Sequence, residues 1–183
     1  MGIFAATLIL GSATFAMAGV PDLQLSLATG PADACVLYNL PNADGGSFDE
    51  AIAVVGFAVT DATVGLTLID GLTNPIPNYP FEDLHLESSD GGLVACAGGT
   101  TADADTDAAG YTQWQAPLAA GGATSSVADL TVVMVNGAAL TSSGGEAIAH
   151  NSADITADGK VDLSSAPELA GALQRARYVI PYL

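Results

Sequence analysis

The chain has 183 residues, which is enough for one sandwich-sized domain and a small appendage but not for two large domains. It carries 20 acidic residues against 3 basic ones, for a formal net charge of −17. A field of this sign repels phosphate backbones and anionic lipid surfaces, so nucleic acid is excluded as a partner. Half of the residues are hydrophobic, yet 21 glycines and 9 prolines interrupt the chain too often for long helices. The composition predicts an all-β protein with many turns.

The N-terminal residues 1–18 are uncharged and apolar, and they end in the sequence AMA. This small-x-small ending is the pattern that signal peptidase accepts, although no basic residue precedes the apolar stretch. Two interpretations follow, a cleaved export signal or a retained apolar segment that packs in an assembly. A membrane span is a third alternative, but the alanine-rich stretch is only marginally hydrophobic. We therefore expect a protein that is secreted, extracellular or at the cell surface, and not integral to the membrane once processed.

Two cysteines, Cys35 and Cys96, lie in the strand-like contexts ACVLY and LVACAG. In an exported protein such a pair most simply forms one disulfide, which would stabilise the fold by roughly 4 kcal/mol. The alternative is two buried free thiols. Neither cysteine has the CxxC spacing or the basic neighbours of a redox or metal site.

Short runs of alternating apolar residues predict about seven half-buried strands between residues 22 and 140. A sandwich is therefore expected over residues 19–140, followed by a linker over 141–150. In the sequence YTQW, Trp114 shares a face with Thr112, and we weigh a core position for it against an exposed sugar-stacking platform. The clearest alternating runs are Leu23/Leu25/Leu27, Val64/Leu66/Leu68, Leu84/Leu86 on either side of His85, and Val133/Val135.

Two turn sequences carry a resemblance to a known family. Asp70 precedes the corner Asn74-Pro75-Ile76-Pro77, and a Thr-Asp-x-x-Gly turn at 106–110 opens a later strand. This pattern resembles the bacterial Ig-like modules of invasin- and intimin-type surface proteins. The resemblance implies an immunoglobulin-like antiparallel β-sandwich.

The C-terminal segment, residues 151–183, contains the sequence DITADGKVDLSS, which has the spacing of a calcium loop. It resembles one half of a dockerin, which implies a short loop-helix appendage. Ser165 stands where such a loop ends in an acidic ligand, so any calcium site should be weak; alternatively, Ser165 caps the following helix. The expected calcium ligands are Asp154, Thr156, Asp158, the carbonyl of Lys160, and Asp162.

Catalytic motifs are not apparent in the sequence, and we predict that the protein is not an enzyme. The two histidines lie apart, His85 facing outward on a strand and His150 in the expected linker without a recognisable partner. The alternating acids of the loop TTADADTDAAG are expected to be solvated, with cation binding as the alternative.

The sequence is compatible with two functions. The first is a self-assembling filament or surface-layer subunit whose apolar terminal segments bind other copies of the same chain. The second is a carbohydrate- or scaffold-binding module, anchored by the dockerin-like segment, with Trp114 as the ligand platform and extracellular glycan as the partner. The C-terminal assembly segment combines cationic and strand-forming residues, namely Arg175, Arg177, Tyr178, Val179, Ile180, Tyr182 and Leu183.

Overall fold

The computed structural model describes residues 19–125 and 130–161. The apolar N-terminal segment, the predicted C-terminal helix and the C-terminal assembly segment lie outside these ranges. Within the described residues the chain forms twelve short strands and two single-turn 3-10 helices, η1 (Phe48–Glu50) and η2 (Phe81–Asp83). The strands are β1 (Leu27–Thr29), β2 (Cys35–Asn39), β3 (Ala51–Ala53), β4 (Val59–Thr60), β5 (Val64–Thr67), β6 (Leu84–Ser88), β7 (Val94–Ala95), β8 (Tyr111–Trp114), β9 (Ala120–Gly121), β10 (Thr131–Val135), β11 (Ala138–Ala139) and β12 (Ile148–Ser152).

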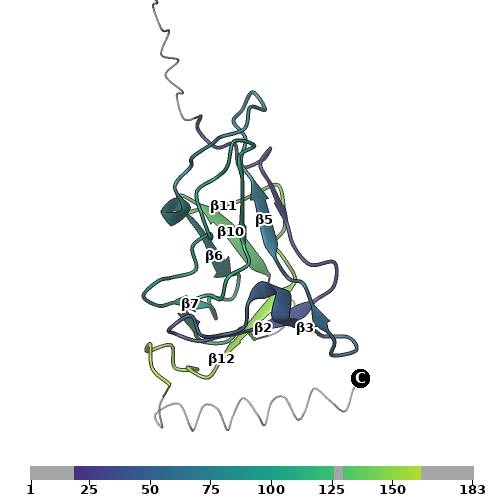
Figure 1. The fold of residues 1–183 in the computed structure, drawn as a ribbon, viewed down its shortest axis with the longest axis vertical. Coiled ribbons are helices and arrows are strands. Elements are labelled where there is room, and N and C mark those ends of the chain that lie inside the picture. Colours follow the sequence, from purple (N-terminus) through teal and green to yellow (C-terminus); the bar gives the residue numbers. More distant parts are fainter. Residues whose placement is uncertain (1–18, 126–129, 162–183) are drawn as a thin grey trace, which may run out of the picture.

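The strands form four small sheets, in the orders β1-β5-β8, β11-β10-β6, β12-β2-β3-β4 and β7-β9. All of the described strand pairs are antiparallel except β12 with β2, which is parallel. Figure 1 shows β5, β6 and β10 along the length of the molecule and β2, β3 and β12 towards its lower end. The predicted all-β sandwich is confirmed. None of the helices in the described ranges is long and apolar enough to cross a membrane.

One hydrophobic core fills the space between the sheets, and period-2 alternation explains how the strands supply it. Val64 and Leu66 on β5 and Val133 and Val135 on β10 are buried, as the sequence predicted. The largest fully buried apolar side chains are those of Trp114, Phe48, Leu37, Leu66, Leu68, Ile76, Leu84, Leu86, Ile148, Val64 and Val133.

The N-terminal alternation of leucines does not form the predicted strand. Residues 23–26 form a turn, because the Asp22 carboxylate accepts hydrogen bonds from the backbone N–H groups of Gln24 and Leu25. This local capping competes with strand pairing, and β1 begins only at Leu27. Leu27 is consequently exposed, and its neighbour Ala28 faces the core.

The predicted linker is wrong over its C-terminal part. Strand β12 begins at Ile148 and runs beside β2 in parallel register, with Ile148 opposite Cys35. Its inward side chains include two polar groups, His150 and Ser152, and both are buried. Because such groups give no alternating hydrophobic signal, the sequence pattern did not predict β12, which continues the sandwich beyond residue 140.

The two turns that carry the Ig-like resemblance lie against each other. The backbone N–H of Asn78 donates to the carbonyl of Thr106 at 2.7 Å, and the Thr106 hydroxyl donates to the carbonyl of Ile76 at 2.6 Å. Asp70 accepts hydrogen bonds from the backbone N–H groups of Leu72 and Asn74. These side chains therefore close turns and fix the corner between β5 and β6.

Candidate functional site

The acidic loop after β12 wraps around the carboxylate of Asp154, which is fully buried. One oxygen accepts hydrogen bonds from the Thr156 hydroxyl at 3.2 Å and the Asp158 backbone N–H at 3.3 Å. The other accepts the backbone N–H of Gly159 at 2.9 Å. Gly159 has a φ of 81°, so it makes the sharp turn that the sequence assigned to it.

The donor set of this loop consists of hard oxygens, which suits calcium. The described residues supply the carboxylates of Asp154 and Asp158, the Thr156 hydroxyl and the carbonyl of Lys160, whereas Asp162 lies outside the described ranges. Across those ranges the structure holds no group of three or more acidic, histidine or cysteine side chains close enough to share a metal. The described part of the loop thus has two carboxylates, which are too few for tight calcium binding.

The loop is docked on the sandwich through strand β9. The backbone N–H of Gly122 donates to the carbonyl of Asp154 at 2.6 Å. A Cβ atom placed on Gly121 would lie 2.6 Å from a carboxylate oxygen of Asp154 and 3.2 Å from the Cα of Ala157. The absence of a side chain at Gly121 is therefore what lets the loop approach β9.

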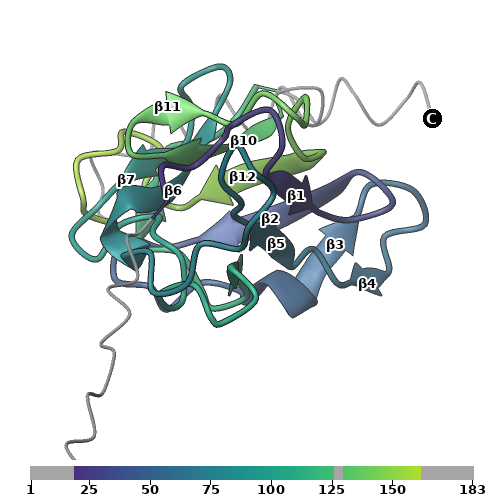
Figure 2. The same cartoon turned by 90° about the horizontal axis from the view of Figure 1, so that it is seen from above.

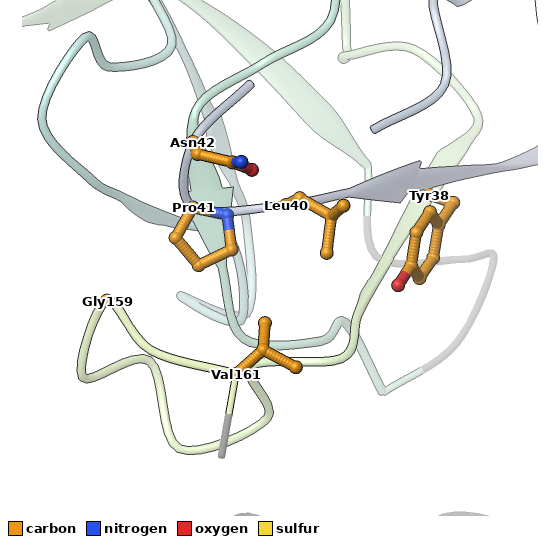
Figure 3. Close-up of a pocket in the computed structure, with 6 residues that line it drawn as sticks. All are labelled: Tyr38, Leu40, Pro41, Asn42, Gly159 and Val161. Carbon is orange, nitrogen blue, oxygen red and sulfur yellow. The ribbon is translucent and has the colours of Figure 1, made fainter. Parts of the chain in front are cut away.

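An open hollow of about 460 Å³ lies between the end of β2 and this loop. Figure 3 shows the side chains of Tyr38, Leu40 and Pro41 on the β2 side and that of Val161 on the loop side. Tyr38 is 46% exposed and Val161 is 57% exposed. The hollow therefore presents an aromatic ring and aliphatic groups to solvent. The sequence gives no sign of it, because β2 has the pattern of an ordinary alternating strand.

His150 is a buried titratable group with a strongly shifted pKa, and its predicted place in a linker without a partner is wrong. Its side chain is buried, with Nε2 2.9 Å from the Thr131 hydroxyl and Nδ1 3.0 Å from the amide nitrogen of Asn39. The Thr131 hydroxyl donates its one hydrogen to the carbonyl of Ile148, so it accepts from Nε2–H, and Nδ1 accepts from Asn39. Burial lowers the pKa of His150 to about 4, against a smaller opposing effect of Asp90. The imidazole is a neutral structural link between β2, β10 and β12.

The predicted disulfide is not formed. Cys35 and Cys96 are both free thiols; Cys35 is fully buried in β2 and Cys96 is partly exposed after β7. Burial raises the pKa of the Cys35 thiol to about 11, so this thiol packs as a small apolar side chain. Pairing was expected because both cysteines lie in strand-like contexts of a chain with a predicted export signal, but similar local sequence does not bring two residues together in space.

Trp114 occupies the core, so the alternative of a sugar-stacking platform at this residue is wrong. The indole is fully buried and donates its N–H to the carbonyl of Thr100 at 3.0 Å. Tyr111, three residues earlier on the other face of β8, is 39% exposed. The alternation predicted for this strand is therefore correct.

The remaining polar candidates serve turns and strand surfaces. His85 lies half-buried on β6 with Nε2 3.2 Å from a carboxylate oxygen of Glu87. In the acidic loop that ends at residue 110, Asp103, Asp105 and Asp107 each accept backbone N–H groups. Asp107 closes a turn within the loop, whereas Asp103 and Asp105 hold the loop to the residues after β8 and to η2. Among the described residues no three acidic side chains lie close enough to share a metal.

The seven residues of the predicted C-terminal assembly segment lie outside the described ranges, so the structure does not place them. Comparisons of the chain with protein-family models, with curated proteins and with solved structures gave no match. The functional argument therefore depends on the loop, the hollow, the exposed apolar surfaces and the distribution of charge.

Proposed function

We propose that the protein is an extracellular structural subunit that assembles with copies of itself through its terminal segments. The observation that carries this proposal is the separation of charge along the chain. The described residues contain 17 of the 20 acidic residues and a single basic one, Lys160, for a formal charge of −16. The other two basic residues, Arg175 and Arg177, stand beside the apolar sequence YVIPYL at the C-terminus.

Such a segment complements the folded body in charge and in polarity. An acidic surface attracts the two arginines, and an open sheet edge or an apolar hollow accepts the strand-forming residues that follow. The hollow beside Tyr38 offers both kinds of contact, since its apolar walls lie next to the acidic turn that contains Asp44. A head-to-tail contact of this kind propagates into filaments unless the rotation between copies closes a ring.

Electron microscopy of the purified full-length protein tests the proposal. Filaments or sheets are expected for the natural sequence and for a variant in which both arginines are replaced by lysine. Monomers are expected for the Arg175→Glu, Arg177→Glu double variant, because its tail would be repelled by the acidic body. Filaments of unchanged length in that variant, or in a chain lacking residues 175–183, would exclude the C-terminal segment as the contact.

The loop around Asp154 supports calcium binding as an accessory property. Its buried carboxylate and its oxygen donors match a hard cation, and the small number of carboxylates predicts an affinity in the millimolar range, about 10⁻⁴–10⁻³ M, as in extracellular modules. Calorimetry at about 10 mM calcium should show binding that Asp158→Asn removes. No heat and no shift of the melting temperature at this concentration would rule out the site.

Carbohydrate binding is the second candidate function, and the hollow in Figure 3 is the observation that favours it. The half-exposed ring of Tyr38 and the side-chain amide of Asn42 both line the hollow, a combination of stacking surface and polar group that suits a sugar. Binding on a glycan array that Tyr38→Ala abolishes, together with a monomeric protein in the micrographs, would favour this function over self-assembly.

A further inference from the structure

The hairpin formed by β3 and β4 carries the largest group of exposed apolar side chains in the described residues. Val55 is 85% exposed, Phe57 71%, Val59 68% and Ile52 38%. The whole hairpin, residues 51–60, contains no charged residue, although the chain as a whole carries −17. Figure 2 shows β4 at the margin of the molecule, with the β3–β4 turn directed away from the other sheets.

Strand β4 is also the free edge of its sheet, whose order is β12-β2-β3-β4. The backbone N–H of Ala53 donates to the carbonyl of Ala58 at 2.9 Å, and Ile52 lies opposite Val59. Because hydrogen-bonded and non-hydrogen-bonded pairs alternate along an antiparallel ladder, Ile52 and Val59 are a non-hydrogen-bonded pair. The N–H and C=O groups of Val59 therefore point outward, away from β3, where an added strand would meet them.

The turn of the hairpin holds an aromatic residue in an unfavourable backbone conformation. Phe57 follows Gly56, and the two have φ angles of 54° and 82°. The left-handed region suits glycine but is costly for a bulky side chain, and the ring of Phe57 is left largely in solvent. The ring of Phe57 is not covered by the described part of the chain, and exposed apolar side chains grouped in this way are expected of a binding surface.

We propose that this hairpin is a two-fold interface with a second copy of the same chain, formed by edge-to-edge pairing of the two β4 strands with Val59 at the symmetry axis. An antiparallel edge is complementary to itself, so Val59 of each copy would exchange both backbone hydrogen bonds. This register places Phe57 opposite Asp61 of the other copy and keeps the two Asp61 carboxylates at opposite ends of the contact.

The distribution of charge makes this hairpin the surface where two copies would repel each other least. Two bodies that each carry a formal −16 in their described parts repel each other, and the repulsion is least where uncharged, projecting surfaces meet. A β4 edge that pairs with itself brings Val55, Phe57 and Val59 to the contact, and the carboxylates nearest to it, those of the two Asp61 residues, lie at its opposite ends. Raising the salt concentration should strengthen this dimer, because salt screens the repulsion between the bodies.

The proposed function and this inference are linked, since the dimer would be a second contact within the same assembly, but they fail independently. The hairpin contact is isologous and closes as a dimer, whereas the tail contact is heterologous and propagates. In the full-length Arg175→Glu, Arg177→Glu variant the dimer should persist although filaments are lost. If the natural sequence forms filaments but no dimer, the tail contact is supported and the hairpin contact is refuted.

Disulfide trapping tests the interface directly. Val59→Cys, made in a Cys96→Ser background, should give a cross-linked dimer under mild oxidation, and its yield should rise with salt. The matched control is Leu72→Cys in the same background, because Leu72 is 80% exposed and lies in a different turn. Equal cross-linking at positions 59 and 72 would overturn the proposal. So would binding of the hairpin to phosphatidylcholine vesicles with no dimer, which would identify a lipid surface as the occupant.

A second variant separates loss of contact from loss of fold. Phe57→Asn places a residue that tolerates left-handed φ at this position, so it should raise the unfolding temperature while weakening dimerisation at least about tenfold. Sedimentation equilibrium measures the second effect, and Leu72→Asn is the control that should leave dimerisation unchanged. A Phe57→Asn protein that is stabilised and still dimerises normally would refute the role of the ring.

Discussion

Acidification should destabilise the fold through His150, and the effect can be calculated from its pKa. The buried imidazole has a pKa of about 4, compared with 6.5 for an ordinary histidine. A base with a lowered pKa binds its proton less readily in the folded state than in the unfolded state. The contribution of the neutral His150 to stability is therefore complete above about pH 6.5, and it is lost as the pH falls towards about 4. With about 1.4 kcal/mol for each tenfold change in affinity, the full loss is about 3 kcal/mol.

About 2 kcal/mol of this loss should already be present at about pH 5, before most carboxylates titrate. Urea unfolding followed by the fluorescence of the single, buried Trp114 gives the free energy of unfolding at each pH. The matched control is His150→Gln, which keeps an amide in the network and does not titrate. Other groups affect both proteins alike, so the difference between their pH profiles isolates the histidine. Parallel profiles between about pH 7.5 and about pH 5 would refute the lowered pKa assigned to the buried imidazole.

The remaining predictions concern packing and thiols. Gly121→Ala should destabilise the protein by about 1–3 kcal/mol and speed proteolysis of the loop after β12, because the new Cβ would collide with that loop. The control Gly144→Ala should have neither effect, since no atom lies within 4 Å of its Cβ position. Trp114→Ala should cost about 3–5 kcal/mol, as measured by urea unfolding, and a glycan-binding phenotype without destabilisation would contradict its core position. A thiol reagent should modify Cys96 in the native protein and Cys35 only after unfolding, and a reducing agent should leave the unfolding temperature unchanged.

Local sequence rules predicted the strands whose two faces differ in polarity. The alternation around His85 and in the segment that ends at Trp114 is reproduced in the structure, because each strand has one face on the core and one on solvent. The same rule failed for β12, where the buried His150 is stabilised by Thr131 and Asn39, which are remote in sequence. It also failed at Leu25, where the capping carboxylate of Asp22 turns the chain.

Among the candidate sites, too, the features set by neighbouring residues could be predicted from the sequence, and those set by distant residues could not. The turn at Gly159 and the wrapping of the loop around Asp154 follow from spacing within eight residues, so sequence alone could identify them. The hollow beside Tyr38 required β2 to meet a loop more than 100 residues later in the chain. The cysteine pairing failed for the same reason, since distance in space is set by the strand order and not by the local context of each residue.

The acidic composition gives the two proposed contacts opposite responses to salt. Attraction between the arginine-bearing tail and an acidic neighbour is electrostatic, and it weakens once the screening length falls to about 10 Å at about 0.1 M salt. The hairpin contact is apolar and opposed by the same acidic field, so screening strengthens it. Low salt should therefore favour chains of single subunits, and high salt should favour closed dimers. An assembly that uses both contacts should be most extensive between these limits, because only there are the tail and the β4 edge occupied together.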